Sequence, residues 1–177
     1  NVKKERAYVV MNDHSTFEKN QNTRLRTPKL AVVGAGMSGI LAAIKLQESG
    51  ISDVTVYEKG EEIGGTWRDN RYPGLSCDVP AHLYTYSFAP NPEFSHRYAR
   101  GAEIHAYFKR VAREYDVYSK IRFSSRLEKA VYSDGRWSVW TTEGEREIYD
   151  IVICASGVLH HPQYPAIEGL DKFSGIK

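Results

Sequence analysis

Apolar and polar positions change their spacing several times between residues 29 and 57, and each change predicts a new element. Lys29–Val33 is a short apolar run that breaks at a glycine-rich turn. Residues 37–48 carry a wide apolar surface with polar positions toward the end, which is typical of a helix packed on a sheet, and Gly50 would cap it. Val54–Tyr57 is a second apolar run, as in a buried parallel strand. The pattern therefore predicts strand, turn, helix and parallel strand in that order.

Beyond residue 100 the pattern predicts one helix and a group of strands. Ala102–Tyr115 has apolar residues spaced by four, three and four positions, which is the period of an amphipathic helix. The pairs Asp134-Gly135 and Glu143-Gly144 separate short apolar runs and predict the turns of an antiparallel meander. Asp150–Gly157 breaks at a glycine, so we expect another central parallel strand that delivers a loop to a site. The expected strands are Ile121–Phe123, Leu127–Tyr132, Trp137–Thr142 and Glu147–Ala155.

The remaining segments are irregular. Residues 59–91 lack a clear period, and irregular stretches of this length are usually functional or disordered; the many aromatic residues here argue against disorder. Residues 1–28 are polar, so we expect an N-terminal extension outside the core. The predicted fold class is α/β, a Rossmann-like domain over residues 29–177 with a parallel sheet and an inserted antiparallel β-meander, incomplete at the C-terminus.

Composition and charge exclude some classes of partner. The chain has 177 residues and a formal net charge of +2 with both signs interspersed, so neither nucleic acid nor a membrane is an expected partner. No apolar run could span a bilayer, and the polar N-terminus lacks the apolar core of a signal peptide. Cys77 and Cys154 form no C-x-x-C pair, and the histidines show no ligand spacing. We expect a soluble cytoplasmic protein with reduced thiols and no metal site.

The turn after the first strand carries the strongest chemical signal, because residues 34–39 read G-A-G-M-S-G. Gly34 permits a tight turn, Gly36 lets a pyrophosphate approach the backbone, and Gly39 lets the helix pack close to the strands. The free N–H groups of the helix would face the phosphates. Glu58 ends the second strand, where it can accept hydrogen bonds from an adenosine ribose. A bare glycine pattern can be a turn without function, but with strand, helix and acid in place it predicts a site for NAD or FAD.

Further motifs carry a resemblance to a known family. Residues 64–67 read G-G-T-W, and residues 70–74 read N-R-Y-P-G. Cys77-Asp78 and Tyr84 follow. With these motifs residues 29–177 resemble the flavin-dependent Baeyer–Villiger monooxygenases, because G-G-T-W, N-R-Y-P-G and C-D together go beyond what general two-dinucleotide flavoproteins share.

The resemblance implies an activity and its cofactors. Members of the family bind FAD at the first glycine motif, and a flavin C4a-peroxide made from NADPH and O₂ attacks a ketone carbonyl to give an ester or lactone. Asp78 resembles a family aspartate near the flavin that pairs with an essential arginine, which makes it the candidate catalytic residue. The cofactor-binding residues that the resemblance implies are Gly34, Gly36, Ser38, Gly39, Glu58, Gly65, Thr66, Trp67, Asp78, Val79, Tyr84 and Leu127.

The chain also departs from the family pattern. Arg68-Asp69 stands where many members carry an aromatic pair. The fingerprint F-x-G-x-x-x-H-x-x-x-W begins with Phe173 and Gly175, but the chain stops before the histidine position. The second glycine motif, which binds NADPH, and the essential arginine would lie beyond Lys177. The chain therefore resembles the first third of an enzyme and should be inactive alone.

Alternatives remain open. The chain can belong to an N- or S-oxygenating flavin monooxygenase, which shares the glycine motif but attacks a soft nucleophile, or it can be a stable fragment without catalytic function. Asp78 can be a turn residue that caps backbone N–H groups, and Trp67 and Tyr84 can be core aromatics.

Overall fold

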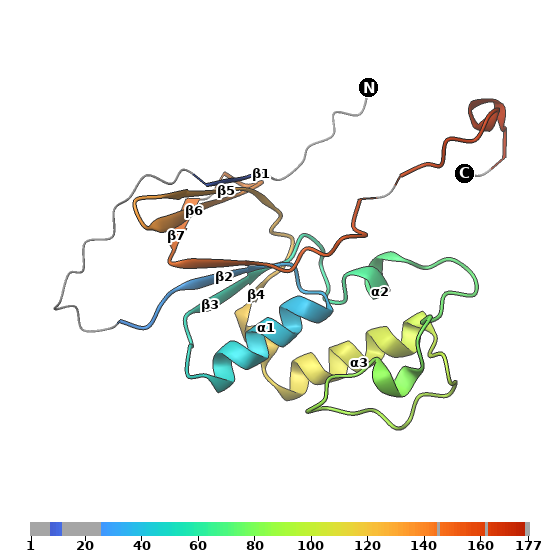
Figure 1. Cartoon of the computed structure of the whole chain (residues 1–177), viewed down its shortest axis with the longest axis horizontal. Coiled ribbons are helices and arrows are strands. Elements are labelled where there is room, and N and C mark those ends of the chain that lie inside the picture. Colours follow the sequence, from blue (N-terminus) through green and yellow to red (C-terminus); the bar gives the residue numbers. More distant parts are fainter. Residues whose placement is uncertain (1–7, 12–25, 145, 162, 176–177) are drawn as a thin grey trace.

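The computed structural model describes residues 8–11, 26–144, 146–161 and 163–175, which form two four-stranded sheets and three α-helices (Figure 1). The strands are β1 (Tyr8–Met11), β2 (Leu30–Val33), β3 (Val54–Tyr57), β4 (Ile121–Arg122), β5 (Leu127–Ser133), β6 (Arg136–Thr141), β7 (Arg146–Tyr149) and β8 (Ile151–Cys154). The helices are α1 (Met37–Glu48), α2 (Thr66–Asp69) and α3 (Gly101–Glu114), with 3₁₀ turns at Ala81–Leu83, Val117–Lys120 and Leu170–Lys172. This arrangement confirms the predicted α/β class.

The first sheet is parallel throughout, in the order β4-β3-β2-β8. Side chains alternate between its two faces along each strand. Leu30 and Val32 are buried in the cluster that includes α1 and α3, whereas Ala31 and Tyr57 are buried against the second sheet. Figure 1 shows the same layers, with α1 and α3 on one face of the parallel sheet and the second sheet on the other. The centre of the sheet is therefore covered on both faces, which explains why its strands are continuous apolar runs.

The two predicted long helices are confirmed. α1 buries Ile40, Ala43 and Ile44 against the sheet, and the N–H of Gly50 donates to a carbonyl of its last turn at 3.0 Å. α3 begins and ends one residue before the predicted positions; its Ile104, Phe108 and Val111 are buried, and Tyr115, the last residue of the predicted spacing, is half-buried directly after it. Period and caps were thus sufficient to locate both elements.

The second sheet has the order β1-β5-β6-β7, and its antiparallel part is the predicted meander. The prediction of a single strand over Glu147–Ala155 was wrong. The chain bends at Asp150, whose carboxylate accepts a hydrogen bond from the Lys29 N–H at 2.8 Å while its own N–H donates to the Lys29 carbonyl at 2.9 Å. This bend sends β7 into the meander and β8 into the parallel sheet. β8 lies at the edge of the described sheet, so the prediction of a central position was wrong as well.

The N-terminal region contributes one strand to the second sheet. Tyr8–Met11 pairs in parallel with β5, so this piece of the predicted extension lies against the meander. Most of the predicted extension, residues 1–7 and 12–25, falls outside the described residues. At the other end, Figure 1 shows the described part of the chain after β8 leading away from both sheets. Within the described part of the chain, no helix has the length and apolar character needed to cross a membrane.

Candidate functional site

The glycine turn between β2 and α1 is held by close backbone contacts. Gly34 has a φ of +99°, and a Cβ at this position would come 2.8 Å from the carbonyl oxygen of Ala155. A Cβ on Gly39 would come 1.8 Å from the carbonyl oxygen of Gly34. Side chains at either position would force the turn open, so glycine is required for the start of α1 to pack against the ends of β2 and β8.

The start of α1 is open to an anion. Gly36 is its N-cap residue, no side chain caps it, and the first turn contains no acidic residue. The first N–H groups of an α-helix have no intrahelical partner and carry the positive end of the helix dipole, so they favour a phosphate.

A second glycine completes a surface without side chains at this helix end. Gly65 has φ 51° and ψ −121°, and a Cβ on it would come 3.1 Å from the Cα of Gly36. The two backbones therefore face each other closely. We call the pair Gly36 and Gly65 the glycine cradle; it matches the close backbone approach that a pyrophosphate requires.

Glu58 lies where the sequence predicts, at the end of β3 beside the glycine turn, and its residue is only 3% exposed. Its Oε2 accepts a hydrogen bond from the N–H of Ala35 at 2.8 Å. Its Oε1 accepts from the N–H of Gly60 at 2.8 Å and from Nη1 of Arg68 at 2.7 Å. Since a carboxylate has about four lone-pair sites, these three donors leave roughly one acceptor position for a ligand.

Arg68 is the residue at this site that sequence reasoning missed. It is 9% exposed, and its guanidinium donates to Glu58, to the carbonyl oxygen of Glu62, and through Nε to Asp69 at 2.7 Å. Burial alone would lower the pKa of Arg68, but the hydrogen bonds to Asp69 and Glu58 outweigh burial and raise it. A charged residue in a four-residue helix carries no periodic signal. Only the unusual pair of charges after G-G-T-W could have drawn attention to it.

The predicted aromatic contacts pack on each other. Nε1 of Trp67 donates to the hydroxyl of Tyr84 at 3.1 Å, and the two rings meet edge to face with centroids 5.5 Å apart. Both side chains are half-buried, and burial raises the pKa of Tyr84. These contacts agree with a role in the core as well as with a wall of a ligand site.

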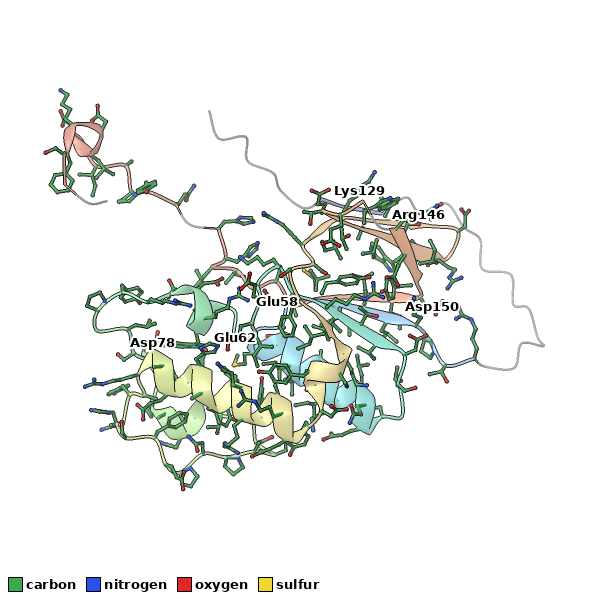
Figure 2. All side chains as sticks on the ribbon, turned by 180° about the vertical axis from the view of Figure 1, so that it is seen from behind. Glu58, Glu62, Asp78, Lys129, Arg146 and Asp150 are labelled. Carbon is green, nitrogen blue, oxygen red and sulfur yellow. The ribbon has the colours of Figure 1, made fainter. Side chains whose placement is uncertain are left out.

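Asp78 lies apart from Glu58, as Figure 2 shows. It is exposed, and within the described residues no hydrogen bond or ion pair involves its carboxylate. The neighbouring Cys77 is buried, and its N–H donates to the carbonyl of Ala99 at 2.8 Å. The alternative role of Asp78 as a cap of nearby N–H groups finds no support among these contacts. Among the other predicted contacts, Ser38, Thr66 and Val79 are exposed and Leu127 is half-buried.

A cavity of about 790 Å³ lies beside this site, between the segment after α2 and the start of α3. Trp67 and Arg68 contribute to its wall, but none of the glycines of the turn or the glycine cradle does. The cavity is therefore a neighbour of the predicted dinucleotide site, and Arg68 stands between the two.

Comparisons with known proteins agree on the type of domain. Residues 32–100 match the family model described as NAD(P)-binding Rossmann-like domain. An uncharacterized monooxygenase of Mycobacterium tuberculosis is 51% identical over 150 residues, which are 85% of this chain and 30% of that protein. A Baeyer-Villiger monooxygenase of Streptomyces coelicolor is 42% identical over 149 residues, 83% of this chain and 28% of that protein.

Solved structures give the same result. A steroid monooxygenase bound to NADP superposes with a TM-score of 0.75 at 38% identity, over 84% of this chain and 29% of that one. The OTEMO complex with FAD and NADP also has a TM-score of 0.75, at 34% identity, over 84% of this chain and 29% of the other. The chain thus spans about 30% of the length of the relatives that it matches.

Proposed function

We propose that this chain, which sequence and fold relate to the Baeyer–Villiger monooxygenases, is the FAD-binding portion of an NADPH- and O₂-dependent flavin monooxygenase that converts ketones to esters or lactones. The observation that carries the proposal is the meeting of the glycine cradle, the uncapped start of α1 and the carboxylate of Glu58. A pyrophosphate needs the first two features and an adenosine ribose needs the third. Because the chain spans about 30% of its relatives, the reaction is proposed for the longer protein.

The residues present fit FAD. The glycine cradle carries no side chain that would keep phosphate oxygens away from its backbone, and the N–H groups at the start of α1 would donate to them. A ribose hydroxyl would donate to the acceptor position that remains on Glu58. Bound FAD would supply the redox chemistry, while the chain binds and orients it. The further contacts that we propose are Gly34, Ser38, Gly39, Thr66, Trp67, Asp78, Val79, Tyr84 and Leu127.

Asp78 would act by electrostatics. Its carboxylate is exposed and makes no ion pair within the described residues, so an ion pair with a group of the longer protein would displace no ion pair seen here. We propose that this group is an arginine, which the carboxylate would hold and orient toward the reacting atoms. A fixed charge of this kind stabilises developing charge in a transition state without transferring a proton.

A thermal-shift titration of the 177-residue chain with FAD tests the proposal. FAD at a hundred times its Kd should stabilise the fold by about 2.7 kcal/mol and raise the melting temperature. FMN is the matched control ligand, because it lacks the adenosine ribose and the second phosphate, and it should give a much smaller shift. An unchanged melting temperature with FAD, while circular dichroism reports an intact fold, would contradict the proposal.

A further inference from the structure

Arg68 occupies a space that the chain leaves open for it. A Cβ on Gly60 would come 2.4 Å from Nη1 of Arg68 and 2.7 Å from its Cζ. Any larger residue at position 60 would displace the guanidinium. The loop after β3 thus turns back at Gly60. The N–H of Gly60 and the guanidinium of Arg68 both donate to Oε1 of Glu58.

The guanidinium is held on two sides. Nη1 lies 2.7 Å from Oε1 of Glu58, and Nε lies 2.7 Å from Oδ1 of Asp69. Asp69 also lies 3.6 Å from the ammonium of Lys59, so its charge is shared between two cations. Because the planar guanidinium has a rigid set of donors, two anchoring points fix its plane and thereby the position of the Glu58 oxygen that it contacts.

Glu58 has little freedom left under these contacts. One oxygen is held by the glycine turn through Ala35, and the other is held by Arg68 and Gly60. A buried carboxylate that loses its cation strongly destabilises the folded state, so Glu58 and Arg68 depend on each other. An acceptor that is already fixed loses less conformational entropy when a ligand binds.

We propose that Arg68 is a positioning residue of the cofactor site, which holds the carboxylate of Glu58 in place for the adenosine ribose of FAD. The inference rests on the proposed function, since FAD is the ligand that it assumes. It adds a residue outside the contacts that the family resemblance implies. It assigns Gly60 the role of making room for the guanidinium.

FAD titrations of the 177-residue chain and its variants test this role. Arg68→Met should raise the Kd for FAD about tenfold, because a carboxylate that is no longer held in place would lose its charge-assisted hydrogen bond from the ribose. Arg110→Met is the matched control, because Arg110 is an exposed arginine of α3 whose guanidinium donates to Glu114 and makes no contact with Glu58 or Arg68 among the described residues. Its Kd should stay within about twofold of the unchanged chain.

The ribose gives a readout that a purely structural role would not change. The unchanged chain should bind FAD about tenfold more tightly than the analogue with a 2′-deoxyadenosine, since that analogue lacks a donor to Glu58. Arg68→Met and Glu58→Gln should both lose this preference, and the double variant should bind no more weakly than the weaker single variant. Gly60→Ala keeps every charge but displaces the guanidinium, so it should lose the same preference even if Arg68→Met folds poorly.

The two proposals fail in different ways. If the unchanged chain does not bind FAD, the proposed function is wrong and the role of Arg68 falls with it. If the unchanged chain binds FAD, but the variants at Arg68 and Gly60 keep the full preference for the ribose hydroxyl, the role of Arg68 alone is wrong. Additive effects of Arg68→Met and Glu58→Gln would also overturn it.

Discussion

The hydroxyl oxygens of Tyr57 and Tyr149 lie 2.7 Å apart and join the two sheets. Tyr57 ends β3 of the parallel sheet, directly before Glu58, and Tyr149 ends β7 of the meander. Their rings also meet edge to face, with centroids 6.2 Å apart. Burial raises the pKa of both hydroxyls, so both keep their protons and donate hydrogen bonds at neutral pH. The meander is thereby fixed to the end of β3, directly before Glu58, the residue proposed to bind the ribose.

Glu147 accepts hydrogen bonds from this pair. The Tyr149 hydroxyl donates to it at 3.0 Å, and the ammonium of Lys29, directly before β2, donates at 2.9 Å. The guanidinium of Arg122 in β4 donates as well. Burial alone would raise the pKa of Glu147, but the hydrogen bonds from Lys29, Tyr149 and Arg122 outweigh it and lower the pKa from 4.5 to about 2. The carboxylate of Glu147 on β7 thus joins the second sheet to β4 and to the residue directly before β2 in the parallel sheet.

We predict that Glu147→Gln destabilises the chain at neutral pH. Because the folded state lowers the pKa of Glu147, its stabilisation is fully present above about pH 4.5 and is lost as the pH falls toward about 2. The free energy of unfolding of the variant should be lower by up to about 3 kcal/mol at pH 7, and the difference should shrink steadily below pH 4.5. Urea denaturation at several pH values measures both effects.

Glu48→Gln is the control for this prediction. Glu48 pairs with Lys45 at 2.7 Å on the exposed side of α1, and such surface pairs contribute little. Its loss should change stability by less than about 1 kcal/mol at any of these pH values. A pH-independent difference for Glu147→Gln would show that the network does not depend on the carboxylate charge.

Two glycines of the turn should respond differently to alanine. A Cβ on Gly36 would make ordinary contacts with the backbone of Gly65, 3.6 Å from its Cα and 4.0 Å from its N. Gly36→Ala should therefore fold normally but raise the Kd for FAD at least about tenfold, because the methyl group would enter the glycine cradle. A Cβ on Gly39 would meet the Gly34 carbonyl oxygen at 1.8 Å, so Gly39→Ala should also lose about 1–3 kcal/mol of stability. Thermal melts with and without FAD separate the two effects. Equal loss of stability in both variants would contradict this assignment.

The fold was predictable wherever one local signal determined an element. The apolar runs of β2 and β3 and the helical spacing of α1 and α3 are such signals, and all four elements were found. The division of Glu147–Ala155 into β7 and β8 was not predictable, because nothing in the local pattern marks the point at which the chain passes from one sheet to the other. The bend depends on Asp150 meeting the backbone of Lys29, which is 121 residues away in the chain. Long-range contacts of this kind leave no mark in a local pattern.

The geometry of the candidate site was predictable to a similar extent. The turn of Gly34 and Gly39 and the position of Glu58 follow from one motif and its spacing, and the structure brings them together. The hydrogen bond from Arg68 to Glu58 was not predicted. It forms only because Gly60 leaves space for the guanidinium and α2 turns back over the loop. Both are tertiary features, and they changed Glu58 from a free carboxylate into a fixed one.

The two thiols should report how the loop around the site opens. Cys154 is exposed at the end of β8, whereas Cys77 is 3% exposed and lies next to Asp78. A thiol reagent should modify Cys154 rapidly and Cys77 at least about a hundredfold more slowly, because Cys77 reacts only after a local opening. Bound FAD should slow the modification of Cys77 further, because a ligand that binds only the closed loop makes its opening rarer. Cys154→Ser isolates the slow reaction, and equal rates for both thiols would contradict the described packing.

Replacement of Asp78 should separate cofactor binding from turnover. Its carboxylate is exposed and makes no hydrogen bond or ion pair within the described residues, so Asp78→Ala should leave the melting temperature of the 177-residue chain nearly unchanged. In the longer protein the same change should lower ketone oxygenation by about a hundredfold, comparable to the loss of one fixed electrostatic partner of a transition state. Glu128→Ala, at an exposed position in β5, is the matched control and should retain activity. NADPH consumption and ester formation should be measured together. Normal ester formation by the Asp78→Ala enzyme would show that Asp78 is a surface residue without a catalytic role.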